Sequence, residues 1–220
     1  MLQHVWERTC QARYLTDVVI ATDDERIRSA AQEFRARVVM TRADHVSGTD
    51  RVAEAASASE APIIVNVQGD EPMIDPSAID AAILGLLDDD MGVVPMGTIK
   101  KRIERQGDIA DPNVVKVVTD AQGNALYFSR SPIPHARDGR EPAAYFKHIG
   151  LYVYRRDFLL SYSDLPVGPL ERAERLEQLR ALENGFKIRV VETEYESLGV
   201  DTPEDWKQVA ELFEKTLVNP

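Results

Sequence analysis

Short apolar segments alternate with helical ones along the first 90 residues, and this alternation constrains the fold more than any other feature of the sequence. Apolar runs of strand length occupy residues 17–23, 37–41 and 63–67. Helical spacing of apolar residues follows each run, over residues 24–34, 49–59 and 76–87. This order is typical of a parallel sheet covered on both faces, which binds ligands beyond the carboxyl ends of its strands.

The pattern changes in the second half of the chain. Residues 113–118 and 125–129 flank the turn sequence Asp-Ala-Gln-Gly and predict an antiparallel hairpin. We expect two further strands, at residues 148–154 and 187–191, and a helix over residues 169–182. A final helix is expected to begin at Pro203. The sequence therefore predicts one α/β domain over residues 1–220, with a mixed, mostly parallel sheet and an antiparallel hairpin insertion.

Composition excludes several classes of protein. The chain has 220 residues, of which 44% are hydrophobic, enough for a folded core. The net charge of −11 leaves no basic surplus for a nucleic acid, so none is expected as a partner. Cys10 is the single cysteine, which favours a reducing compartment, and no segment has the length of a membrane span or the pattern of a signal peptide. We therefore expect a cytoplasmic protein without a membrane partner.

The strongest apolar run ends in polar residues that suit a ligand site. The sequence Val-Asn-Val-Gln-Gly-Asp-Glu-Pro spans residues 65–72 and places Asp70 just beyond the strand. Mg²⁺ often takes one or two carboxylates together with substrate phosphates, so Asp70 is a candidate ligand. The alternative is a turn whose acids are simply solvated.

A second acidic turn lies near the end of the chain. Gly-Val-Asp-Thr-Pro-Glu-Asp spans residues 199–205 and includes Asp201. Taken alone, it is better explained as an ordinary helix start, because acids are favoured at a helix N-terminus. A metal role for Asp201 requires that this turn lie beside Asp70.

A polar, glycine-containing stretch at residues 41–51 opens the second helix. It could present backbone N–H groups to an anion or a base. The alternative is a loop followed by an N-cap from Ser47 or Thr49.

Two further groups could serve a polyhydroxylated, anionic ligand. Residues 171–180 carry many charges, most of which are expected to form a solvated helix face, although Glu174, Glu177 and Gln178 could face such a ligand. Arg130, Lys147 and His148 could supply positive charge or hydrogen bonds, while His148 could equally be structural.

Seven blocks of the sequence, in this order, resemble the CMP-Kdo synthetases, the 3-deoxy-manno-octulosonate (Kdo) cytidylyltransferases. The resemblance runs over nearly the whole chain, and the blocks lie at residues 40–49, 65–72, 113–118, 125–130, 148–152, 176–180 and 199–205. Seven blocks in one order are far more specific than any single block.

The resemblance implies a fold, a reaction and a site. The fold would be that of the nucleotide-diphospho-sugar transferases, Rossmann-like, in a homodimer, with residues 111–155 forming an acceptor-binding and dimerisation part. The reaction would transfer CMP from CTP to Kdo, with release of pyrophosphate, for lipopolysaccharide synthesis. The implied site residues are Asp70 and Asp201 as catalytic Mg²⁺ ligands, Arg42, Ser47, Gly48 and Gln68 for the nucleotide, and Arg130, His148, Tyr152, Glu177 and Gln178 for Kdo.

The sequence departs from the family pattern at its start. Family members open with a strand and a loop of the type Pro-Ala-Arg-x-x-Ser-x-Arg-x-Pro-Gly-Lys-Pro, which carries basic groups for the triphosphate, and these 220 residues contain no such loop. Loss of the first strand would expose strand edges, and loss of the basic groups would weaken catalysis. We therefore expect little or no activity from these residues alone.

Two alternatives remain open at this stage. A related cytidylyltransferase could use another acceptor, such as a sialic acid or a sugar-like alcohol phosphate. The chain could also be a binding or dimerising module without enzymatic activity.

Overall fold

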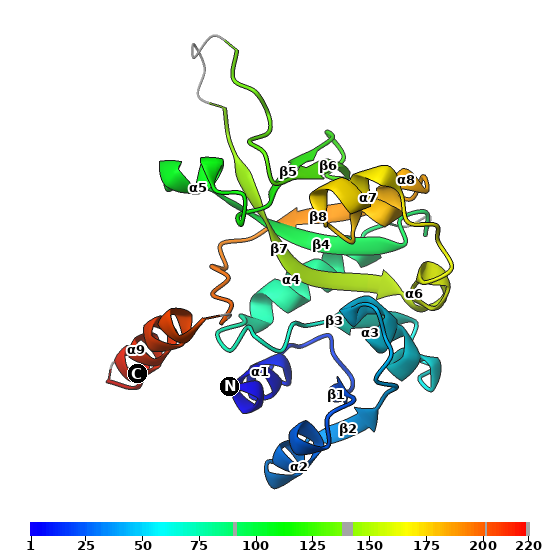
Figure 1. Ribbon diagram of the computed structural model, residues 1–220, viewed down its shortest axis with the longest axis vertical. Helices are drawn as coiled ribbons and strands as arrows, with labels where there is room; N and C mark the ends of the chain where they lie inside the picture. The colour runs from blue at the N-terminus through cyan, green and yellow to red at the C-terminus, as the bar shows by residue number, and fades with distance from the viewer. Residues whose placement is uncertain (90–91, 138–142, 201, 219–220) are drawn as a thin grey trace.

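The computed structural model describes residues 1–89, 92–137, 143–200 and 202–218 (Figure 1). A six-stranded mixed sheet forms the larger part, with its strands in the order β6-β5-β7-β4-β8 and with β3 pairing with β7 as well. Its strands are β3 Ile63–Asn66, β4 Met96–Arg102, β5 Lys116–Thr119, β6 Ala125–Ser129, β7 Phe146–Arg155 and β8 Ile188–Glu192. The predicted fold class, an α/β protein with a mixed sheet, is confirmed.

Strand β7 organises this sheet, because β3, β4 and β5 all pair with it. These pairings are antiparallel, as is the predicted hairpin of β5 and β6, whereas β4 and β8 run parallel. Antiparallel pairing therefore extends well beyond the hairpin to which the sequence analysis assigned it.

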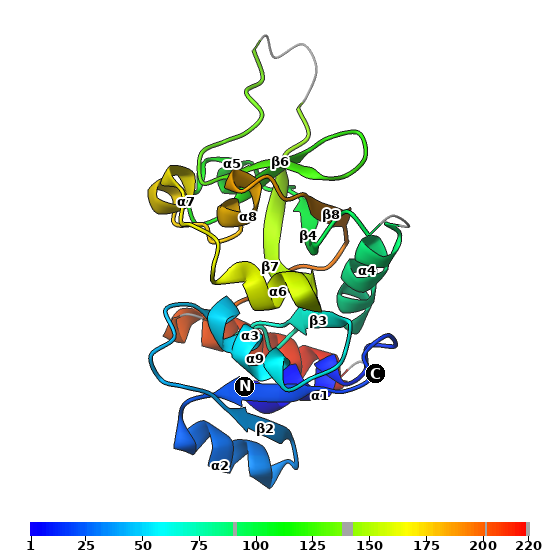
Figure 2. The same ribbon diagram turned by 90° about the vertical axis from the view of Figure 1, so that its right-hand side faces the viewer.

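The first two strands form a separate two-stranded sheet, β1 Val19–Thr22 parallel to β2 Arg37–Met40. Figure 2 shows this sheet at one end of the molecule, beside helix α2 Glu25–Glu33. In the described part of the chain, β1 pairs only with β2, and β3 pairs only with β7. The first three strands thus do not form the continuous parallel sheet that their alternation with helices predicted.

Four of the five predicted helices, at residues 24–34, 49–59, 76–87 and from 203 onward, are confirmed with small differences in their bounds. Helix α4 begins at Pro76 and ends at Leu87, as predicted, and the Asp75 carboxylate caps it by accepting from the Ser77 N–H at 2.8 Å. The remaining helices are α1 Leu2–Thr9, α3 Gly48–Ser57, α5 Gln106–Ala110, α6 Arg156–Tyr162, α7 Pro169–Glu174, α8 Leu179–Glu183 and α9 Pro203–Val218.

The helix predicted over residues 169–182 was wrong as a single element. It divides into α7 and α8, because Arg175 takes the left-handed conformation, with φ 53°, and ends α7. The division places Glu177 and Gln178 in a turn rather than on a helix face.

Two apolar clusters cover the faces of the larger sheet. Helix α4 packs Ala78, Ile79 and Leu86 against Leu151 and Val153 of β7 in one cluster. The second cluster joins α3, α6 and α8 to strands β4–β8 through buried residues that include Tyr154, Phe158, Leu159 and Leu179. No helix among the described residues is long and apolar enough to cross a membrane.

Candidate active site

Aromatic side chains on β7 form one wall of the candidate site. The ring centroids of His148 and Tyr152 lie 5.4 Å apart, and those of Tyr152 and Tyr154 lie 6.1 Å apart. Burial lowers the pKa of His148 to about 3 and raises the pKa values of both tyrosines above their ordinary range. These three rings are therefore uncharged at neutral pH and can act only through hydrogen bonds and stacking.

The turn between α7 and α8 supplies the facing polar groups. The Tyr152 hydroxyl donates to Gln178 Oε1 at 3.2 Å, and the Tyr162 hydroxyl donates to the Glu177 carbonyl at 2.7 Å. The second contact fixes the backbone of the turn, since Tyr162 is almost fully buried. The structure thus places Tyr152 beside the turn that carries Glu177 and Gln178, and their contacts with Kdo stay predictions.

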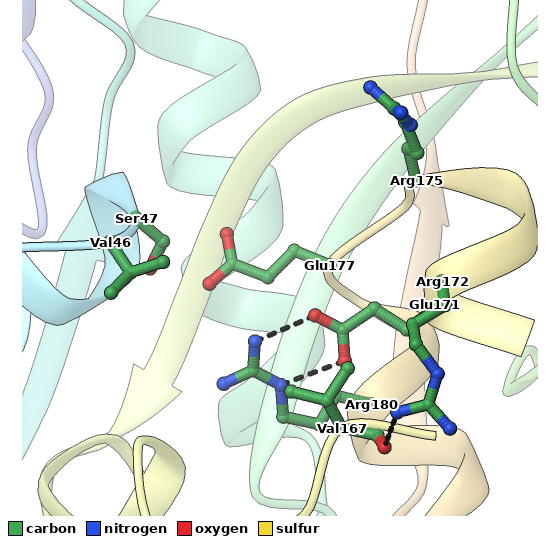
Figure 3. A pocket seen from close by; sticks show the side chains of 8 residues that line it. All are labelled: Val46, Ser47, Val167, Glu171, Arg172, Arg175, Glu177 and Arg180. Carbon is green, nitrogen blue, oxygen red and sulfur yellow. Dashed lines mark hydrogen bonds and ion pairs between the residues drawn. The ribbon is translucent and has the colours of Figure 1, made fainter. Parts of the chain in front are cut away.

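Helix α3 begins at the other side of this turn. Ser47 caps the helix by accepting from the Asp50 N–H at 3.1 Å. Burial raises the pKa of the Glu177 carboxyl, while hydrogen bonds from the Ser47 and Thr49 hydroxyls oppose this shift. Figure 3 shows the Glu177 carboxylate pointing from the α7–α8 turn toward Ser47. Glu177 therefore links the predicted nucleotide side, Ser47 and Gly48, to the predicted Kdo side.

Two buried polar atoms in this network have no partner among the described residues. They are Oε1 of Glu177, which can accept a hydrogen bond, and Nε2 of Gln178, which can donate one. Buried polar atoms are nearly always paired in folded proteins, so these two are expected to take a ligand or an ordered water as partner.

A cavity of about 270 Å³ opens beside these groups. Its lining consists of Val46, Ser47, Val167, Glu171, Arg172, Arg175, Glu177 and Arg180 (Figure 3). Arg180 is already paired there, since its guanidinium contacts both carboxylate oxygens of Glu171 at 2.6 and 2.8 Å.

The loop after β3 carries the predicted metal ligand. The Val200 N–H donates to the Asp70 carbonyl at 2.9 Å, and the Tyr195 hydroxyl donates to the Glu71 carboxylate at 2.7 Å. The 195–200 segment is thereby fastened to this loop, which is the juxtaposition that a metal role for Asp201 requires. Asp201 itself lies outside the described residues. Gln68 lies in the same loop and packs close to Gly150 of β7. A Cβ atom added at Gly150 would lie 3.9 Å from the Cγ atom of Gln68.

The described residues contain no group of three or more His, Cys, Asp or Glu side chains that could hold a metal ion. Mg²⁺ commonly needs only one or two carboxylates, because substrate phosphates and water complete its coordination. Asp70, in a loop at the end of a strand, suits this arrangement.

Two predicted site residues have structural contacts instead of a place in this network. The Arg130 guanidinium donates to the carbonyls of Glu174 at 2.8 Å and Pro112 at 2.9 Å. The Arg42 side chain is 69% exposed, with Nε 3.4 Å from an Asp44 carboxylate oxygen. Their contacts with Kdo and nucleotide stay predictions.

Comparison with known proteins identifies the family. Residues 1–188 match the cytidylyltransferase family. A 3-deoxy-manno-octulosonate cytidylyltransferase of Solibacter usitatus is 69% identical over 218 residues, which cover 99% of this chain and 86% of that protein. A protein of the same name from Geobacter metallireducens is 55% identical over 225 residues, which cover 98% of this chain and 88% of that protein. The chain belongs to the 3-deoxy-manno-octulosonate cytidylyltransferase family.

Solved structures agree with this family assignment. A CMP:2-keto-3-deoxy-manno-octonic acid synthetase, solved in complex with CTP, superposes with a TM-score of 0.92 at 44% identity and covers 98% of this chain and 88% of its own. A 4-diphosphocytidyl-2C-methyl-D-erythritol synthase from Anaerococcus prevotii reaches a TM-score of 0.63 at 10% identity, which shows a shared nucleotidyltransferase fold alone.

The sequence analysis of this family member missed several groups in the network. Thr49 was considered only as a helix cap, yet its hydroxyl interacts with both Glu177 and Tyr154. Thr98 was not considered at all, although its Oγ1 lies 2.9 Å from His148 Nε2. The strand that carries Thr98 was itself not predicted, so no pattern could have placed that hydroxyl beside β7.

Proposed function

We propose that this chain transfers CMP from CTP to the anomeric hydroxyl of Kdo and releases pyrophosphate. The observation that carries the proposal is the Glu177 carboxylate, which interacts with hydroxyls at the start of α3 while its own turn contacts β7. The groups assigned to nucleotide and to sugar thereby share one continuous polar network. The names of the relatives at 69% and 55% identity support the same substrates.

The chemistry requires positioning more than a covalent nucleophile. The sugar hydroxyl oxygen attacks the α-phosphorus of CTP, a new C–O–P linkage forms, the bond to the β-phosphate oxygen breaks, and the hydroxyl proton passes to solvent. Gln68, Ser47 and Gly48 would orient the nucleotide, with Arg42 at the rim. Tyr152, His148, Glu177 and Gln178 would orient the hydroxyls of the sugar, with Arg130 bracing the turn from outside.

Mg²⁺ is the proposed cofactor, and Asp70 and Asp201 would hold it. When bound, the ion would neutralise charge on the phosphate oxygens during the displacement. The contribution of the protein is to hold the two turns together through the Val200–Asp70 hydrogen bond and the contacts of Glu71.

A homodimer is also proposed, with the antiparallel part over residues 111–155 in its interface. Leu126 on β6 is 62% exposed, the largest exposed fraction among the leucine side chains of that part. A single exposed apolar side chain is ordinary on a protein surface, so the dimer is supported by the family resemblance, and Leu126 only marks where the interface can be tested. Light scattering of the purified chain, compared with the Leu126→Glu variant, would test this assembly.

Pyrophosphate release by the chain with CTP, Kdo and Mg²⁺ tests the proposed activity. We expect weak, Kdo-dependent release that Asp70→Ala abolishes and that Asp157→Ala, a change at a fully exposed carboxylate, leaves unaltered. Sialic acid and an alcohol phosphate replace Kdo in parallel reactions. Faster release with either acceptor, or no release with any acceptor from a folded chain, would overturn the proposal.

A further inference from the structure

Thr98 is a fully buried hydroxyl at the centre of the larger sheet. It lies on β4, where the pairing with β7 shifts register: Thr98 stands opposite Tyr152, whereas Ile99 stands opposite Ile149. Gly150 and Leu151 of β7 are therefore extra residues without a partner in the β4 ladder. Thr98 Oγ1 reaches into this bulge, 2.8 Å from the Leu151 carbonyl and 3.1 Å from the Ile149 carbonyl.

The third neighbour of this hydroxyl is His148, whose Nε2 lies 2.9 Å from Thr98 Oγ1. A threonine hydroxyl has one proton to donate and lone pairs to accept, while a backbone carbonyl can only accept. The shortest contact of Oγ1 is with the Leu151 carbonyl at 2.8 Å, so we place the single Thr98 proton on that contact. Oγ1 must then accept from His148, so that Nε2 carries the imidazole proton and Nδ1 carries the lone pair.

The surroundings of His148 hold the ring in this orientation. Its backbone N–H donates to the Val115 carbonyl at 2.8 Å. The ring contacts Phe128 edge-on at 5.0 Å between centroids and lies near Tyr152 as well. The low pKa that burial gives the ring keeps it neutral at physiological pH, so one nitrogen donates and the other accepts.

We propose that Thr98 is a positioning residue, which fixes His148 as the Nε2–H tautomer and so presents Nδ1 as a hydrogen-bond acceptor for a hydroxyl of the acid sugar. This inference rests on the proposed function, because it assigns the hydroxyl to Kdo. It adds a residue on β4 to a site otherwise built from β3, β7, α3 and the α7–α8 turn.

The unpaired atoms nearby fit the same ligand chemistry. Glu177 Oε1 is a second acceptor and Gln178 Nε2 is a donor, both buried and without a partner among the described residues. A polyhydroxylated acid offers several O–H donors together with acceptor oxygens, so it can satisfy both acceptors and the donor. The opposite tautomer of His148 would present an N–H instead and would reverse the direction of one hydrogen bond.

Two substitutions separate the hydroxyl from the volume of the side chain. Thr98→Val removes the hydroxyl and keeps the shape, while Thr98→Ser keeps the hydroxyl and removes a methyl group. Thr119→Val, at a half-buried threonine on β5 of the same sheet, is the matched control. Long-range ¹H–¹⁵N spectra of the imidazole report the tautomer without any substrate, and titration with Kdo in the presence of CDP reports the dissociation constant of the sugar.

We expect Nε2–H in the unaltered chain, loss of this single tautomer in Thr98→Val, and retention in Thr98→Ser and Thr119→Val. The dissociation constant for Kdo should rise about tenfold in Thr98→Val, the value of one hydrogen bond, while that for CDP stays constant. An Nδ1–H tautomer in the unaltered chain would overturn the inference. So would equal loss of Kdo affinity in Thr98→Val and Thr98→Ser, because packing and not the hydroxyl would then be responsible.

The two proposals fail in different ways. A tautomer that is independent of Thr98, in a chain that binds Kdo, would overturn this inference and leave the proposed function standing. A chain with CDP bound that does not bind Kdo would overturn the proposed function, and the sugar-binding role of Thr98 with it.

Discussion

The ion pair of Glu171 and Arg180 should be essential for the α7–α8 turn. Both side chains are 11% exposed, and two hydrogen bonds of 2.6 and 2.8 Å join them. The Arg180 guanidinium also lies over the Tyr162 ring, 5.2 Å from its centroid. Arg180→Met would leave the Glu171 carboxylate buried without its partner, which costs about 3–5 kcal/mol of unfolding free energy in such pairs.

For a chain of this length, that loss should lower the melting temperature by about 6–20 °C. Calorimetry of Arg180→Met would measure it, with Arg172→Met, at an exposed arginine of helix α7, as the control. The double variant Glu171→Leu/Arg180→Met should recover part of the loss, because no lone charge stays buried. A loss below about 1 kcal/mol, the value of a surface pair, or a double variant less stable than Arg180→Met, would refute this reasoning.

Two glycines should respond to alanine with opposite signs. Gly85→Ala should destabilise the protein by about 1–3 kcal/mol, because the new methyl group would overlap the Val191 side chain. Gly107→Ala places its methyl group in open space and should stabilise α5 by up to about 1 kcal/mol. Urea unfolding of both variants checks this contrast. His148→Gln should flatten the pH dependence of stability. In the unfolded chain the His148 side chain binds a proton below about pH 6.5, whereas in the folded chain its pKa is about 3 and it stays neutral. Stability that is present above pH 6.5 is therefore lost on acidification, at up to about 1.4 kcal/mol per pH unit. Unfolding curves between pH 4 and 7, with the exposed His4→Gln as control, measure the difference in slope; equal slopes for His148→Gln and the unaltered chain would contradict it.

Local signals account for the elements that the sequence predicted well. Helix α4 begins with an Asp-Pro pair and carries an apolar stripe, so its bounds at Pro76 and Leu87 follow from capping and periodicity. Strand β4 was missed because its sequence, Met-Gly-Thr-Ile-Lys-Lys-Arg, ends in three basic residues and shows no alternation. Its assignment as a strand comes from pairing on both sides, with β7 and β8, which no local pattern reveals.

Some residues of the candidate site could likewise be found from local sequence signals, and others could not. Asp70 was accessible to sequence reasoning, because it follows a strong strand in an α/β pattern. Glu177 and Gln178 were distinguishable from their charged neighbours only through the family resemblance, since spacing alone favoured a solvated helix face. The bulge in β7 that gives Thr98 its contacts has no sequence signature beyond Gly150.

The charged run at residues 171–180 shows why spacing misled. A continuous helix would have paired Glu171 with Arg175 and Glu174 with Gln178 on its surface. The left-handed Arg175 instead turns the chain, so that Glu171 reaches Arg180 and Glu174 accepts from the Ser129 hydroxyl at 2.7 Å. Removing these two carboxylates from water costs solvation free energy, which only well-formed hydrogen bonds and ion pairs offset. They therefore hold the start of the turn, and Glu177, within the turn, has one carboxylate oxygen without a partner among the described residues.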